Sequence, residues 1–105
     1  MQERRAAKRV RANINVRWET LKTQGRGSVC DLSSSGCFVL TGGEVVRGEL
    51  TRMDLSLTDQ VITFWGYVVY PVSEMGFAVR FVFGSEADQE SLEGWVKGIE
   101  AVARP

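Results

Sequence analysis

Residues 61–83 read VITFWGYVVYPVSEMGFAVRFVF, and this stretch sets the expected fold class. Its first part, residues 61–70, consists almost wholly of β-branched and aromatic residues, which are enriched in strands. Residues 71–76 are typical of a turn. Apolar side chains then recur at every second position, which is the period of a half-buried strand: Phe77, Val79, Phe81 and Phe83. The stretch therefore predicts two strands joined by a turn.

The same period continues toward the N-terminus. Four further segments have strand patterns: residues 14–19, 28–32, 37–41 and 53–58. The serine-rich residues 33–36 are expected to form a turn, and Gly25 and Gly27 to flank another. Six short strands joined by turns predict a small antiparallel barrel or sandwich, with Trp18 and Trp65 in its core.

The end of the chain changes to a helical period. One apolar stripe runs along it: Leu92, Trp95, Val96, Ile99 and Val102. Ser85 is the expected N-cap, and acidic residues follow it at the positive end of the helix dipole. The prediction for the 105-residue chain is one mainly β domain, a six-stranded antiparallel barrel with a C-terminal amphipathic α-helix over about 86–102.

Composition excludes most catalytic chemistry. The chain has no histidine, which removes Ser/His/Asp and Cys/His nucleophile systems and imidazole metal sites. Two cysteines are too few for a four-cysteine zinc site or a disulfide framework. No carboxylate pair and no P-loop has the spacing that acid–base or phosphoryl chemistry needs. We expect no enzyme, no metal and no cofactor.

Targeting signals are also missing from the sequence. No apolar run approaches the length of a membrane span, and residues 1–16 lack the apolar stretch of a signal peptide. We therefore expect a cytoplasmic protein that does not insert into a membrane. Cys30 and Cys37 should then be reduced and structural, with a redox role beside the serine turn as the alternative.

Charge is distributed unevenly along a chain whose net charge is zero. Residues 1–26 hold eight basic residues against two acidic ones, whereas the last third is acidic. A basic arm on a neutral body points to a local anionic partner, although blocks of like charge are often simply solvated. We divide the chain into a basic arm, residues 1–12, and a barrel domain with its helix, residues 13–105.

Two short motifs carry a family resemblance. Arg5 and Arg9 are spaced Arg-x-x-x-Arg, and residues 31–36 read Asp-Leu-Ser-Ser-Ser-Gly. Together they resemble the PilZ domain family, whose pattern is RxxxR followed by (D/N)xSxxG and whose members bind the bacterial second messenger cyclic di-GMP. Agreement extends to the later strand segments at residues 46–48, 65–68 and 75–81. The resemblance implies a PilZ-type barrel that binds cyclic di-GMP.

The residue types fit that ligand. An arginine fork matches the O6 and N7 acceptors of guanine and also pairs with phosphate, which suits Arg5 and Arg9. Asp31 is expected to accept hydrogen bonds from the guanine N1–H and N2–H₂ edge. Ser33 offers a hydroxyl, and Gly36 lets the backbone approach the ligand. By the resemblance, Arg4 beside the pair fits a second ligand molecule in a stacked dimer.

Two other functions remain open from the residues. A PilZ-like adaptor that binds no ligand would dock a protein through its acidic helix or through residues 42–52. A nucleic-acid binder is disfavoured because the aromatic residues fall at core-facing positions and the last third is acidic. The downstream protein partner has no signature in the sequence.

Overall fold

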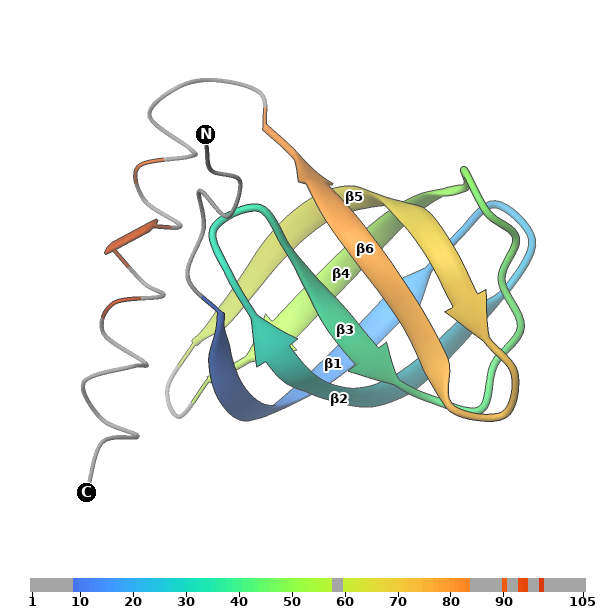
Figure 1. Ribbon diagram of the computed structural model, residues 1–105, viewed down its shortest axis with the longest axis horizontal. Coiled ribbons are helices and arrows are strands. Elements are labelled where there is room, and N and C mark those ends of the chain that lie inside the picture. Colours follow the sequence, from blue (N-terminus) through green and yellow to red (C-terminus); the bar gives the residue numbers. More distant parts are fainter. Residues whose placement is uncertain (1–8, 58–59, 84–89, 91–92, 95–96, 98–105) are drawn as a thin grey trace, which may run out of the picture.

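The computed structural model describes residues 9–57, 60–83, 90, 93, 94 and 97. The six predicted strands are present and form one closed antiparallel barrel in the order β1-β2-β3-β6-β5-β4 (Figure 1). Their bounds are β1 Val10–Glu19, β2 Gln24–Leu32, β3 Gly36–Leu40, β4 Leu50–Ser56, β5 Val61–Val72 and β6 Gly76–Val82. A barrel, and not a sandwich, is therefore confirmed.

All six strands contribute inward side chains to the core, and these alternate with outward ones except where the register shifts in β1 and β2. Trp18 of β1 is fully buried there, and its ring meets that of Phe77 edge to face with centroids 5.2 Å apart. Its indole Nε1 donates a hydrogen bond to Thr41 Oγ1 at 3.1 Å, so the one polar atom of the ring is satisfied. Trp18 is thus a core residue, as its strand pattern predicts.

The turn expected between Gly25 and Gly27 lies elsewhere. Both glycines are in β2, and the β1–β2 turn occupies residues 20–23, where the Thr20 hydroxyl accepts hydrogen bonds from the backbone N–H groups of Lys22 and Thr23. A Cβ on Gly25 would stand 2.7 Å from Trp18 Cζ2. These glycines therefore make room for neighbouring groups in the barrel wall and do not mark a turn.

Trp65 was expected in the core, and the structure corrects this prediction. Trp65 faces outward with 46% of its surface exposed, and Tyr67 likewise with 48%. Its neighbour Gly66 and Val68 are the buried positions in this part of β5, and a Cβ at Gly66 would overlap the Val79 side chain, so only glycine fits there. Strict alternation then turns the tryptophan to the outside.

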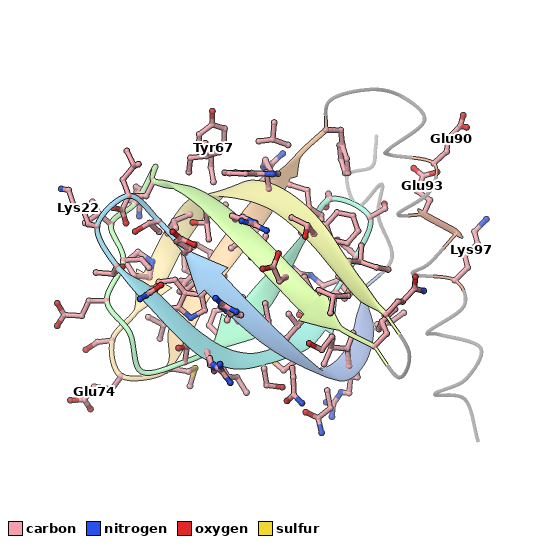
Figure 2. All side chains as sticks on the ribbon, turned by 180° about the vertical axis from the view of Figure 1, so that it is seen from behind. Lys22, Tyr67, Glu74, Glu90, Glu93 and Lys97 are labelled. Carbon is pink, nitrogen blue, oxygen red and sulfur yellow. The ribbon has the colours of Figure 1, made fainter. Side chains whose placement is uncertain are left out.

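Both chain ends lie largely outside the described residues. β1 begins at Val10, so residues 10–12 of the predicted arm belong to the first strand, while the division into arm and barrel stays a prediction. Of the predicted helix, Glu90, Glu93, Gly94 and Lys97 have helical backbone and are exposed. Figure 2 shows the side chains of Glu90, Glu93 and Lys97. The apolar stripe lies outside the described residues, so the helix also stays a prediction. In the described part of the chain, no helix is long and apolar enough to cross a membrane.

Candidate ligand-binding site

Arg9 and Asp31 meet at the end of the barrel where β1 begins and β2 ends. Arg9 Nη1 donates to Asp31 Oδ2 at 2.8 Å, and the two side chains are 62% and 38% exposed. Exposed ion pairs of this kind contribute only about 0.2–1 kcal/mol. The pair holds both groups in position, yet a competing anion or donor can open it at little cost.

The serine turn of residues 33–36 is built around one buried hydroxyl. Ser33 Oγ accepts hydrogen bonds from the backbone N–H groups of Ser35 at 3.2 Å and Gly36 at 3.3 Å. The Ser33 N–H donates to the Gly36 carbonyl at 2.9 Å, and the Phe81 N–H donates to the Ser35 carbonyl at 2.8 Å. The turn is therefore tied both to itself and to β6, and Ser33 already has a structural role.

Gly36 also has a structural reason for being glycine. A Cβ at this position would overlap the carbonyl oxygen of Val79 on β6. Close approach of β3 and β6 thus requires glycine here whether or not a ligand approaches as well.

The structure brings four of the six predicted site residues to one end of the barrel: Arg9, Asp31, Ser33 and Gly36. Arg4 and Arg5 lie outside the described residues. Strand register adds two arginines that the motif does not contain, since Arg11 is the Cα partner of Asp31 and Arg80 that of Gly36. Both are exposed. Only the pairing of the strands could have placed them beside the motif.

The two cysteines are free and differ in environment. Cys37 points inward on β3, and its Sγ donates to Met53 Sδ at 3.9 Å. Burial above all, and then the charges of Cys30 and Asp31, raise the pKa of the Cys37 thiol to about 12, against a smaller opposite effect of Arg9. A thiol with that pKa stays protonated at neutral pH, which supports a structural role. Among the described residues, no three Cys, Asp or Glu side chains are grouped to hold a metal ion.

Comparison with known proteins shows the family and the fold of the chain. The sequence pattern of the PilZ domain family matches residues 3–98. No protein in the search of curated sequences matches significantly.

Solved structures share the fold. The PilZ domain of YcgR from Escherichia coli, solved with cyclic di-GMP, superposes with a TM-score of 0.80 at 18% identity, covering 97% of this chain and 95% of that one. The PilZ domain of CeSA from a cellulose-synthesizing bacterium gives 0.73 at 16% identity, covering 89% and 98%. The Bacillus subtilis inhibitor of motility MotI/DgrA gives 0.69 at 18% identity, and this chain covers 54% of it.

At these identities the superpositions establish the fold alone, whereas the family pattern spans all six strands and both motifs. The chain belongs to the PilZ domain family.

Proposed function

We propose that the chain is a cytoplasmic receptor for cyclic di-GMP that acts on a protein partner and catalyses no reaction. The observation that carries the proposal is the 2.8 Å contact between Arg9 and Asp31 beside the turn of residues 33–36. It unites the two halves of the family motif at one end of the barrel. The PilZ domain of YcgR, solved with cyclic di-GMP, adds support by its likeness over nearly the whole chain.

The chemistry follows from the groups present. Asp31 accepts from the N1–H and N2–H₂ edge of one guanine, while Arg9, together with Arg5 four residues earlier, donates to guanine O6 and N7 or to phosphate. Binding exchanges the weak exposed Arg9–Asp31 pair for several charge-assisted hydrogen bonds. By the family resemblance, Arg4 beside the pair would contact a second ligand molecule, so a stacked pair is part of the proposal. Rearrangement of residues 1–9 around the ligand then changes the surface offered to the partner.

The test is a calorimetric titration of the full chain with cyclic di-GMP. The variants Arg5→Ala, Arg9→Ala and Asp31→Ala are each expected to lose about tenfold to a hundredfold in affinity, because a bidentate contact to guanine contributes about 1–3 kcal/mol. Arg47→Ala, an exposed arginine of the β3–β4 connection, is the matched control and should bind as the parent does. A stoichiometry near two supports the stacked pair. No heat and no shift in melting temperature would refute the receptor function.

An adaptor that binds no ligand is the second candidate. It is favoured by the group of exposed aromatic side chains on β5, Trp65, Tyr67 and Tyr70, which can bind a protein whether or not a ligand is present. Nucleic acid ranks lower still. The expectation that the aromatic residues face the core does not hold for Trp65, Tyr67 and Tyr70, which face outward. The zero net charge of the chain nevertheless disfavours binding of a nucleic acid.

A further inference from the structure

We propose that a protein partner docks on the outer face of the barrel with an acidic segment that carries one large apolar side chain. We call this surface the docking face and define it by Arg17, Arg26, Leu21, Leu50 and Trp65. The proposal rests on the proposed function in one respect, that the docked protein would be the partner on which the receptor acts. Binding at the docking face itself does not involve cyclic di-GMP.

The basic half of the docking face is a pair of opposed arginines. Arg17 of β1 and Arg26 of β2 are Cα partners, both are exposed, and together with Gln24 and Gly25 they line a hollow of about 300 Å³. Like charges directly opposite each other on paired strands are destabilising. An anion seated between the two guanidinium groups would remove that repulsion.

Among the described residues, no carboxylate lies between the Arg17 and Arg26 guanidinium groups to remove their repulsion. Neither arginine forms an ion pair within 4.0 Å with a described residue. Asp54, the Cα partner of Arg17 on β4, instead accepts a 2.7 Å hydrogen bond from the Thr63 hydroxyl and lies 3.4 Å from Arg52 Nε. The two guanidinium groups therefore remain available to an anionic group from outside the barrel.

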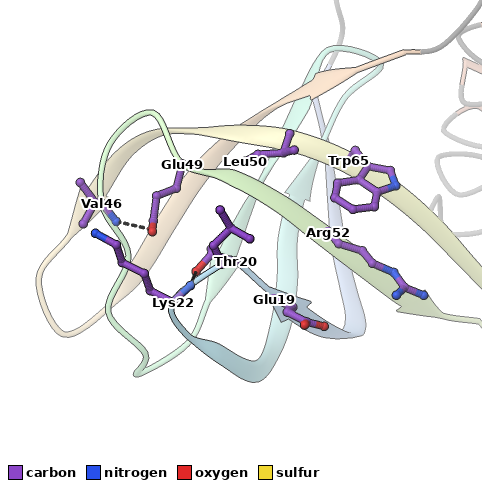
Figure 3. Close-up of a pocket in the computed structure, with 9 residues that line it drawn as sticks. Glu19, Thr20, Lys22, Val46, Glu49, Leu50, Arg52 and Trp65 are labelled. Carbon is purple, nitrogen blue, oxygen red and sulfur yellow. Dashed lines mark hydrogen bonds between the residues drawn. The ribbon is translucent and has the colours of Figure 1, made fainter.

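The apolar half is a second hollow of about 440 Å³ beside the β1–β2 turn (Figure 3). Two acidic and two basic side chains also line it, so its lining has no net charge: Glu19, Glu49, Lys22 and Arg52. Four exposed apolar side chains line it: Leu21 at 102%, Val46 at 56%, Trp65 at 46% and Leu50 at 44%. Single exposed apolar residues are ordinary, but four around one hollow mark an interaction site. Tryptophan and arginine are also the residues that most often dominate binding energy at protein interfaces.

Strand register makes the two hollows adjacent. Gln24, Glu19, Arg52 and Trp65 are successive Cα partners across β2, β1, β4 and β5, and Glu19 and Gln24 border one hollow each. Arg17 is two residues before Glu19 on the same outward side of β1. A single extended segment can therefore place a carboxylate between the arginines and an apolar side chain against Trp65.

The charge pattern favours a protein segment over nucleic acid. Glu19 and Asp54 flank the arginine pair on the same outer face, so the basic surface does not continue as the track that a phosphodiester backbone needs. A carboxylate on a peptide needs only the local pair.

The apolar half of the docking face lies away from the ligand site. Lys22, in the turn beside the apolar hollow, is at the opposite end of the barrel from Glu93 and from the start of β1 (Figures 1 and 2). Both sites are therefore accessible at the same time.

The test uses a fluorescent peptide, Glu-Asp-Glu-Trp-Glu-Asp, and its amide counterpart, Gln-Asn-Gln-Trp-Gln-Asn, with the full chain and no cyclic di-GMP. We expect the acidic peptide alone to raise fluorescence anisotropy and to shift the NMR signals of the Arg17 and Arg26 Nε–H groups and the Trp65 indole N–H. Arg17→Gln and Arg26→Gln should each weaken binding about two- to fivefold, since exposed ion pairs are weak, and Trp65→Ala about tenfold.

Lys97→Gln, which removes an exposed charge at the other end of the chain, is the control and should bind normally. The charge-reversed pair Arg17→Glu with Arg26→Glu should abolish binding while the melting temperature is retained. Equal binding of the amide peptide, no binding at about millimolar peptide, or tighter binding of a single-stranded oligonucleotide would each overturn the proposal. Asp31→Ala separates the two sites, because it should lose cyclic di-GMP and keep the peptide.

Discussion

Replacing Gly36 by alanine separates the structural role of this motif residue from its role toward a ligand. The added Cβ would overlap the Val79 carbonyl oxygen, and because that atom belongs to the backbone, no side-chain rotation can relieve the contact. Strand β3 must move away from β6, with which it pairs from Gly36 to Leu40. The φ angle at Gly36 is not positive, so space alone is responsible for the effect.

The magnitude follows from two opposing terms. Overpacking costs about 1–3 kcal/mol in a tightly packed structure. Alanine also lowers the conformational entropy of the unfolded chain, which stabilises the folded state by about 0.4–1 kcal/mol where alanine can adopt the backbone conformation. We therefore expect Gly36→Ala to lower the free energy of unfolding by about 1–2 kcal/mol. For a domain of this size that corresponds to roughly 4–15 °C in melting temperature.

Gly42→Ala is the matched control, because its Cβ would have nothing within 4 Å and its φ is not positive. Urea unfolding of parent, Gly36→Ala and Gly42→Ala without ligand measures the effect. Gly42→Ala should be neutral or slightly stabilising. Equal stability of both variants would refute the reasoning and leave ligand approach as the reason for glycine at position 36.

Three more predictions concern the barrel. Thr51→Val should raise the free energy of unfolding by about 1 kcal/mol in urea titration, because the fully buried Thr51 hydroxyl has no hydrogen-bond partner in the described structure; a loss of stability would contradict this. Ser33→Ala should lower the free energy of unfolding by about 1–2 kcal/mol even without ligand, because two backbone N–H groups lose their acceptor. An unchanged urea midpoint would contradict this and leave contact with the ligand as the role of the hydroxyl. Burial raises the pKa of the Cys37 thiol from 9.0 to about 12. The thiol therefore loses its proton at lower pH in the unfolded chain than in the folded one. The free energy of unfolding should then keep its full contribution from Cys37 below pH 9 and fall as the pH rises toward 12. The decline should be shallower in Cys37→Ala, and parallel pH curves for the two proteins would argue against it.

Much of the fold could be predicted from period-2 patterning, because strand formation depends on local alternation. The β1–β2 turn could not, since Gly25 looks like a turn residue until the Trp18 ring is known to lie against it. Trp65 was misplaced for a related reason. In residues 61–70, large apolar side chains occupy both sets of alternate positions, so the sequence does not show which set is buried. The structure buries Gly66 and Val68, and alternation then places Trp65 outside.

The site divides in the same way. Arg9 and Asp31 could be singled out from the sequence because each belongs to a short, contiguous motif. The structure brings their side chains into contact. Arg11 and Arg80 could not, because their place beside the motif depends on register between strands distant in the sequence. The opposed pair of Arg17 and Arg26 likewise becomes visible only when β1 and β2 are aligned.

Closure of the barrel has a consequence for how such a domain can acquire partners. Each of the six described strands pairs with a neighbour on both sides over part of its length, so no strand has a free edge along its whole length. A partner that docks on the barrel wall then meets mainly outward side chains, which alternate along the strands with the inward ones that maintain the core. The two sets can change independently during evolution, so the outer surface of one stable barrel can be altered without refolding.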